Sequence, residues 1–178
     1  YLPTFNSASI ATSSVNIKGL SSRYLLFNDD VFFCKAVAPE MFFDEAGKSV
    51  LRGKFSARQQ YQRSLSWNMH MNNGARLAGF DESNMFRLAH CCQPIDKELV
   101  LNFREKNPEV FNINMSYKFR HNNQFTLTSL SAHLALKNDR AAVLDNQDWV
   151  HLPAGKIYNW NPQEIAKAFM LLKHENCY

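Results

Sequence analysis

Two short apolar runs on either side of a polar step form the most marked pattern in the chain. Residues 23–27 and 31–34 are short and rich in aromatic or branched residues, which predicts two buried strands and not helices. Asn28, Asp29 and Asp30 lie between them. Neighbouring carboxylates repel each other and lose hydration near a sheet. Either a polar turn or a divalent cation with oxygen ligands explains why they are held together.

Apolar residues recur at intervals of three or four in four later segments, and this period predicts amphipathic helices. The segments are residues 56–73, ended by Gly74; residues 94–106, begun by Pro94; residues 125–137; and a helix capped by Asn161. Their expected inward residues are Tyr61, Leu65, Asn68 and Met69; Ile95, Leu99 and Phe103; Leu127, Leu130 and Leu134; and Ile165, Ala168, Phe169 and Leu172.

Shorter elements are expected between these helices. Asn6 or Ser7 can cap a short helix that runs towards Asn16, and Gly19 suits its end. Residues 39–43 predict a brief helical or extended piece, and residues 44–48 predict a surface turn that leads into a strand at 49–55. Residues 76–87 are expected to form a loop or short helix that delivers His90.

Composition narrows the class of protein. The chain has 178 residues, 46% of them hydrophobic, and 14 are Phe, which is enough for one domain with a packed core. The net charge of +4 suits an anionic ligand, but no basic run is dense enough to indicate a nucleic-acid partner. No apolar run approaches the roughly 20 residues that a membrane span needs.

The cysteines and two of the histidines favour structural roles. Cys91 and Cys92 are adjacent, so they lack the spacing of a zinc-binding pair, and we expect reduced thiols. His70 and His133 fall within predicted helices, where a histidine with satisfied hydrogen bonds is more common than a ligand.

Four sub-motifs in the first quarter of the chain resemble, in order and spacing, the second conserved block of the Stealth family of sugar-phosphate transferases. They are Leu2-Pro3-Thr4-Phe5-Asn6-Ser7, Ile17-Lys18-Gly19-Leu20-Ser21, Phe27-Asn28-Asp29-Asp30-Val31-Phe32 and Pro39-Glu40-Met41-Phe42-Phe43. This family includes bacterial capsular polysaccharide phosphotransferases and the animal enzyme that places N-acetylglucosamine-1-phosphate on lysosomal glycoproteins.

A second match lies further along the chain. His90-Cys91-Cys92-Gln93-Pro94-Ile95-Asp96-Lys97 resembles the His-x-Pro-x-Pro-Leu-x-Lys opening of the family's third block. Tyr117-Lys118-Phe119-Arg120 and the stretch from His133 to Ala141 resemble later landmarks of that block. The chain departs from the family pattern at Ala8, Ala11 and Cys92, where the family usually has His, Glu and Pro.

The resemblance implies an α/β fold similar to the GT-A glycosyltransferases, a nucleotide-sugar fold in which a mixed sheet of short strands is flanked by amphipathic helices. We expect one partial catalytic domain over residues 1–178, with an acidic block at 1–55 and a His/Arg block at 85–141. An earlier family block, with a strand ending in a Val-Asp-Gly-type segment, is not found, so the N-terminal part of the domain is expected to be missing.

The implied activity is transfer of hexose-1-phosphate, in particular N-acetylhexosamine-1-phosphate, from a UDP-sugar to a sugar hydroxyl of a capsular polysaccharide. Asp29 and Asp30 would balance the pyrophosphate charge through Mg²⁺ or Mn²⁺, with Asp30 as the closer ligand. His90 matches the catalytic histidine of the family, and an imidazole ordinarily titrates near neutral pH, as a general base requires. Arg120 would bind two phosphate oxygens.

Four further residues are candidates for substrate binding: Asn6, Ser7, Asn28 and Lys97. The expected partners are a UDP-sugar donor and a polysaccharide or oligosaccharide acceptor, in the cytoplasm or at the inner face of the cell membrane. Two other functions stay open, a metal-dependent glycosyltransferase and a non-catalytic nucleotide-sugar-binding module. The first would release UDP instead of UMP, and the second would release neither.

Overall fold

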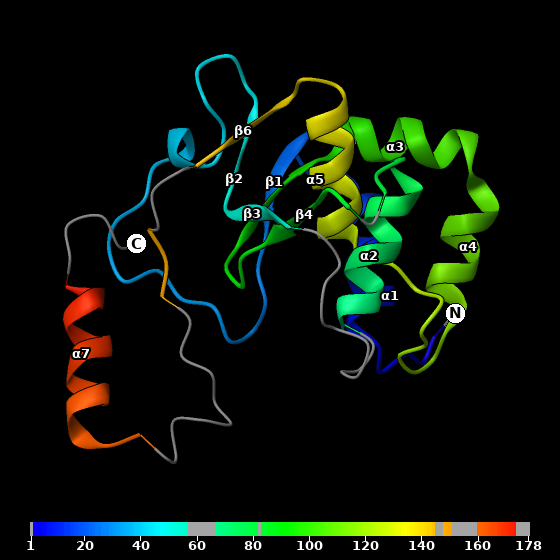
Figure 1. Cartoon of the computed structure of the whole chain (residues 1–178). Helices are drawn as coiled ribbons and strands as arrows, with labels where there is room; N and C mark the ends of the chain where they lie inside the picture. The colour runs from blue at the N-terminus through cyan, green and yellow to red at the C-terminus, as the bar shows by residue number, and fades with distance from the viewer. Residues whose placement is uncertain (1, 57–66, 82, 145–147, 151–159, 174–178) are drawn as a thin grey trace.

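The structure is a computed structural model that describes residues 2–56, 67–81, 83–144, 148–150 and 160–173 (Figure 1). The helices are α1 (Ser7–Ser13), α2 (Trp67–Leu77), α3 (Lys97–Lys106), α4 (Pro108–Ser116), α5 (Leu127–Lys137) and α7 (Pro162–Leu172), with 3₁₀ turns η1 (Ser14–Asn16) and η2 (Pro39–Met41). The strands are β1 (Arg23–Leu26), β2 (Ser49–Leu51), β3 (Gly53–Ser56), β4 (Met85–Leu88), β5 (Gln93–Asp96) and β6 (Ala141–Val143).

The strands pair two by two. β1 and β5 are antiparallel, with Arg23 opposite Asp96 and Leu26 opposite Gln93. β2 pairs with β6 in parallel, and β3 pairs with β4 in the antiparallel sense. The prediction of a mixed α/β fold with short strands is confirmed, whereas the likeness to the GT-A fold stays a prediction.

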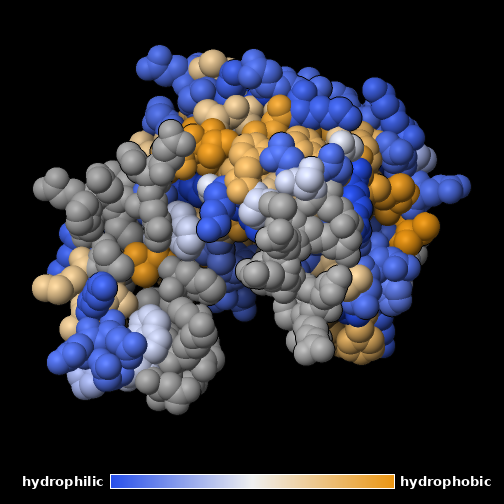
Figure 2. Space-filling model, viewed as in Figure 1, coloured by the Kyte–Doolittle hydropathy of each residue, from blue (hydrophilic) through white to orange (hydrophobic). Residues whose placement is uncertain are grey.

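Helix α5 forms the centre of the core. It lies between the strand pairs and helices α2 and α3 (Figure 1), and its residues from Ser129 to Ala135 are all buried. Leu127, Leu130 and Leu134 point inward as predicted. They pack with Ile95, Val100, Phe111 and Phe125 in the largest apolar cluster of the described residues. Apolar side chains also gather over the β2–β6 pair and α5 on the face shown in Figure 2.

Helix α2 does not stop at Gly74, as the sequence analysis predicted, but continues to Leu77. A Cβ atom on Gly74 would lie 2.9 Å from the backbone nitrogen of Leu130, so glycine is needed because α5 packs against this point. The predicted inward face is also wrong at Met69, which is 43% exposed, whereas His70 is buried. Tyr61 and Leu65 lie outside the described residues.

Three predicted boundaries are wrong for a common reason, namely tertiary pairing. The loop expected at residues 76–87 contains strand β4, which pairs with β3. Residues 93–96 form β5 instead of a helix that begins at Pro94, and Asp96 caps α3 by accepting a hydrogen bond from the amide of Leu99. The strand expected at 49–55 divides at Arg52 into β2 and β3, which have different partners.

The second apolar run, residues 31–34, is not a strand. A turn follows β1, in which the amide of Val31 donates to the carbonyl of Asn28. Phe32 is 76% exposed, and the ring of Phe33 contacts the rings of Phe27 and Phe42 instead of a neighbouring strand. The apolar run is therefore used for aromatic contacts near the end of β1.

The predicted helix caps are confirmed at both ends of the chain. Asn6 is the N-cap of α1, where its side-chain oxygen accepts a hydrogen bond from the amide of Ala8. Asn161 and Glu164 cap α7 reciprocally. Ala168 of α7 is buried as predicted, but Phe169 is 57% exposed, so that part of the expected stripe is wrong. No helix within the described ranges is long and apolar enough to cross a membrane.

Candidate active site

The β1–β5 ladder brings the two sequence blocks together. Because Leu26 lies opposite Gln93, the residues that follow β1 meet the loop that precedes β5. This loop is held at Ala89, whose amide donates to the carbonyl of Arg52 and whose carbonyl accepts from Nε2 of Gln93. His90, the next residue, therefore has a fixed position beside the end of β1.

His90 faces Asn28 and Asp30, two of the polar residues that follow β1. Its Nε2 lies 3.3 Å from Nδ2 of Asn28 and 3.7 Å from Oδ2 of Asp30. An amide nitrogen can only donate, so in this contact the lone pair of Nε2 accepts from Asn28 and the ring proton lies on Nδ1. The carboxylate of Asp30 can only accept, and it faces the same nitrogen as a negatively charged neighbour. The three side chains together have the composition of a general base with its orienting partners.

A small cavity of about 40 Å³ lies beside His90. It is lined by Leu26, Asn28, Met71, Leu88, Ala89, His90, Cys91, Gln93 and Thr128. The volume is close to that of one water molecule, so a ligand as large as a sugar ring does not fit inside this cavity. Met71 and Thr128 were missed by sequence reasoning, because the inward faces of their helices were assigned from apolar periodicity.

The two cysteines after His90 do not have the low pKa that a nucleophilic cysteine needs. Burial raises the pKa of Cys91 to about 12 and the pKa of Cys92 to about 11. Both thiols therefore stay protonated at neutral pH, and a thiolate is the form that attacks a substrate or binds a metal. His90 remains the group in this loop with the chemistry of a base.

Arg120 forms a second cluster, on the α4–α5 loop (residues 117–126). Its guanidinium donates from Nη2 to Oγ of Ser7, at 3.1 Å. Asn6 is fully buried, and its Nδ2 donates to the carbonyls of Tyr117 and Phe119 at 3.2 and 2.9 Å. The structure thus joins three predicted site residues, Asn6, Ser7 and Arg120, and gives Asn6 the geometry of a residue that positions the α4–α5 loop.

The start of helix α2 contacts both clusters. Met71 lines the cavity beside His90, and the ring of its neighbour His70 donates from Nε2 to the carbonyl of His121 at 2.7 Å. The amide of Thr126 in turn donates to the carbonyl of His70. One turn of helix therefore connects the His90 loop to the loop that carries Arg120.

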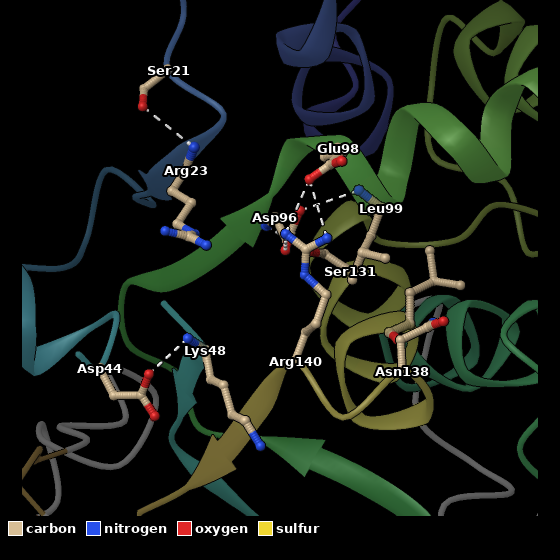
Figure 3. A network of polar contacts seen from close by, with 11 residues as sticks. Ser21, Arg23, Asp44, Lys48, Asp96, Glu98, Leu99, Ser131, Asn138 and Arg140 are labelled. Atoms are coloured by element: carbon tan, nitrogen blue, oxygen red, sulfur yellow. Dashed lines mark hydrogen bonds and ion pairs between the residues drawn. The ribbon is translucent and has the colours of Figure 1, made fainter. Parts of the chain in front are cut away.

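Lys97 lies apart from these clusters, at the opposite end of the β1–β5 ladder. Its Nζ donates to the carbonyls of Ile17 and Leu20, so it fastens the segment before β1. Beside it, Arg140 pairs with the buried carboxylate of Asp96 at 2.8 Å and with Glu98 at 3.1 Å (Figure 3). This network ties the start of α3 to the end of α5.

The carboxylates of Asp29 and Asp30 are exposed, and within the described ranges no group of three His, Cys, Asp or Glu side chains is arranged to hold a metal ion. Mg²⁺ differs from zinc in this respect, because it commonly binds one or two carboxylates together with water and substrate phosphates. The exposed Asp29–Asp30 pair fits a magnesium ion that arrives with a nucleotide. It does not fit a cation caged by protein ligands alone.

Comparison with known proteins adds independent evidence. Residues 1–51 match the family model described as Stealth protein CR2, conserved region 2. The chain is 33% identical over 148 residues to an exopolysaccharide phosphotransferase of Nocardia farcinica, covering 79% of this chain and 29% of that protein. It is 29% identical over 147 residues to the capsular polysaccharide phosphotransferase SacB of Neisseria meningitidis serogroup A, covering 79% and 27%.

The matches to these relatives reach beyond the second conserved block, because 79% of the chain is aligned whereas the family model ends at residue 51. A 46-residue match to the exopolysaccharide phosphotransferase cps2G of Lactiplantibacillus plantarum rises to 50% identity. The chain spans less than a third of the length of the curated relatives. The family model and the relatives agree with the sub-motifs read from the sequence, and the chain belongs to the Stealth protein family.

Proposed function

We propose that this chain is part of a sugar-phosphate transferase that moves N-acetylhexosamine-1-phosphate from a UDP-sugar to a hydroxyl of a growing polysaccharide. The observation that carries the proposal is the position of His90, whose Nε2 lies 3.7 Å from the carboxylate of Asp30 although 60 residues separate them. The names of the relatives, exopolysaccharide and capsular polysaccharide phosphotransferases, support the same reaction class.

His90 is the proposed general base. Asn28 donates to Nε2 and so keeps the ring proton on Nδ1; the acceptor hydroxyl takes the place of this contact and gives its proton to Nε2, and Asp30 faces the positive charge that results. The ring is one third exposed, so a large saccharide can reach it. The deprotonated oxygen then attacks the phosphorus that bears the sugar, and UMP leaves.

Charge on the phosphates has two proposed counterparts in the chain. Asp29 and Asp30 would hold Mg²⁺ or Mn²⁺, which supplies positive charge to the pyrophosphate when it is bound. Arg120 provides a fixed guanidinium, oriented by Ser7, that suits two oxygens of one phosphate. We assign no substrate contact to Lys97, because its ammonium is committed to the carbonyls of Ile17 and Leu20.

Calorimetric titration with UDP-N-acetylglucosamine tests the donor site. Binding that requires Mg²⁺ and weakens at least about tenfold in Asp30→Asn is the expected result, since one of two carboxylates for the cation is lost. Asp139→Asn is the matched control, because it removes a carboxylate that is 90% exposed and pairs only with Lys48 among the described residues. Equal affinity in Asp30→Asn and the control would reject the donor site.

Product analysis of the complete protein separates the proposal from its alternatives. Release of UMP that disappears in His90→Gln identifies transfer of a sugar phosphate, whereas release of UDP identifies a glycosyltransferase. Binding with release of neither nucleotide identifies a binding module. The His90→Gln variant is expected to fold, because the ring of His90 is partly exposed and lies in a loop.

A further inference from the structure

Two phenylalanine rings are exposed beside Arg120 and lie almost parallel. Phe5 is 69% exposed and Phe119 is 63% exposed. Their ring centroids are 5.8 Å apart, and their planes differ by 17°. Nζ of Lys118 lies 5.7 and 5.8 Å from the two centroids. We call these three residues, Phe5, Lys118 and Phe119, the aromatic platform.

Buried groups fix the platform in place. The amide of Phe5 donates to the carbonyl of Lys118 at 3.0 Å, and Asn6, which is fully buried, donates to the carbonyl of Phe119 at 2.9 Å. Gln124, also fully buried, accepts from Asn6 and from the amide of His121. Exposed rings cost hydration free energy, and here their backbone is held rigidly by buried hydrogen bonds. This arrangement holds two largely exposed aromatic rings in place, so a ligand that packs on them pays little entropic cost for ordering the protein.

The two segments that carry the platform contain basic residues and no acidic ones. Its rings come from two segments, residues 2–28 and 110–138, which contain no Asp or Glu. Lys118 and Arg120 flank the ring of Phe119 in the sequence, and Arg120 is held by Ser7. An apolar surface bordered by two cations, with no carboxylate in either segment, complements a ligand that has an apolar face and a negative charge.

We propose that the aromatic platform is a subsite for a phosphate-bearing pyranose of the acceptor saccharide. The C–H face of a pyranose is apolar and packs flat on an aromatic ring, while the ammonium of Lys118 pairs with the adjoining phosphodiester. The rings are 69% and 63% exposed, which leaves room for a long polymer, whereas a compact UDP-sugar does not need an exposed surface. The inference rests on the proposed function, which supplies the acceptor.

Two synthetic trisaccharides of N-acetylglucosamine test the subsite, one joined by phosphodiesters and one joined by neutral glycosidic bonds. Binding to the 178-residue chain is measured by calorimetry and by saturation-transfer NMR with irradiation of aromatic protons. Phe119→Leu keeps an apolar side chain but removes the flat ring, and Lys118→Gln removes one charge. Ile113→Ala is the matched control, because Ile113 is an apolar residue of α4 that is 54% exposed and lies outside the platform.

The expected result is saturation transfer from aromatic protons to the ring protons of the phosphodiester trisaccharide. Its Kd is expected to rise roughly tenfold in Phe119→Leu and by a smaller factor in Lys118→Gln, and to stay unchanged in the control. The affinity of UDP-N-acetylglucosamine is expected to be the same in Phe119→Leu as in the wild type. The neutral trisaccharide is expected to bind more weakly than the charged one.

Three results would overturn the inference. They are unchanged binding of the charged trisaccharide in Phe119→Leu, equal affinity for the neutral trisaccharide, and a loss of UDP-N-acetylglucosamine affinity in Phe119→Leu, which would assign the platform to the donor. Failure of the proposed function looks different, because it appears as metal-independent or absent donor binding while the trisaccharide results stand.

Discussion

Two buried histidines are expected to make the stability of this chain depend on pH below neutrality. His133 is 1% exposed; its Nε2 accepts a hydrogen bond from the amide of Phe86 and its Nδ1 donates to the carbonyl of Ser129, which requires the neutral ring. Burial lowers the pKa of His133. Burial also lowers the pKa of His70, and the charge of Arg120 contributes in the same direction.

The direction of this pH dependence follows from the number of protons that the folded and unfolded states bind. A histidine whose pKa is lowered by folding binds fewer protons in the folded state, so acid favours the unfolded state. Stability is fully present above the unfolded pKa of 6.5 and falls as the pH drops below it, until the folded pKa is reached. A histidine that stayed neutral throughout a fall in pH from about 7.5 to about 5.5 would cost about 1.4 kcal/mol, which is the upper limit for each of the two rings over this range.

Urea unfolding at constant ionic strength, followed by tryptophan fluorescence between these pH values, measures the effect. His133→Gln retains one donor and one acceptor, and it is expected to be less stable near neutral pH but to lose less stability on acidification than the wild type. A wild-type stability that is flat over this range, or an unchanged pH dependence in His133→Gln, would refute the reasoning.

Two further predictions concern packing. Gly74→Ala raises helix propensity, which is worth about 1 kcal/mol, but the new Cβ would lie 2.9 Å from the backbone nitrogen of Leu130. We therefore expect the free energy of unfolding, measured by chemical denaturation, to fall by roughly 1–2 kcal/mol. A gain in stability would refute the close contact. Asp148→Asn leaves the guanidinium of Arg52 buried without its bidentate carboxylate partner. We expect the free energy of unfolding, measured by thermal and urea denaturation, to fall by about 3 kcal/mol. An unchanged stability would mean that the ion pair is dispensable.

Local chemistry in the sequence was sufficient for the elements with strong start signals. Asn6 caps α1 and the Asn161–Glu164 pair caps α7, because a side-chain oxygen satisfies amides that have no partner within the helix. The spacing of apolar residues correctly predicted the inward face of α5, because that helix is buried along most of its length. The strand expected at 23–27 is observed at Arg23–Leu26, but it is half-buried or exposed along its length and not buried as predicted.

Elements that depend on a distant partner were not predictable in the same way. Gly74 is a helix-ending signal in isolation, but the packing of α5 against α2 keeps it inside a helix. Pro94 is a helix-starting signal, but pairing with β1 places it in a strand. Residues 31–34 have the composition of a strand and have no strand partner among the described residues.

In the candidate site, too, the sequence predicted the chemistry of the residues, and tertiary structure decided which of them meet. Sequence alone selected Asn28, Asp30 and His90 by their chemistry and by family resemblance, but carried no distance between them. The register of β1 on β5 brought His90 to within 3.7 Å of Asp30, and it put Lys97 at the other end of the same ladder. Residue type fixes what a side chain can do, whereas long-range strand pairing decides which side chains meet, because that pairing depends on contacts between residues far apart in the chain.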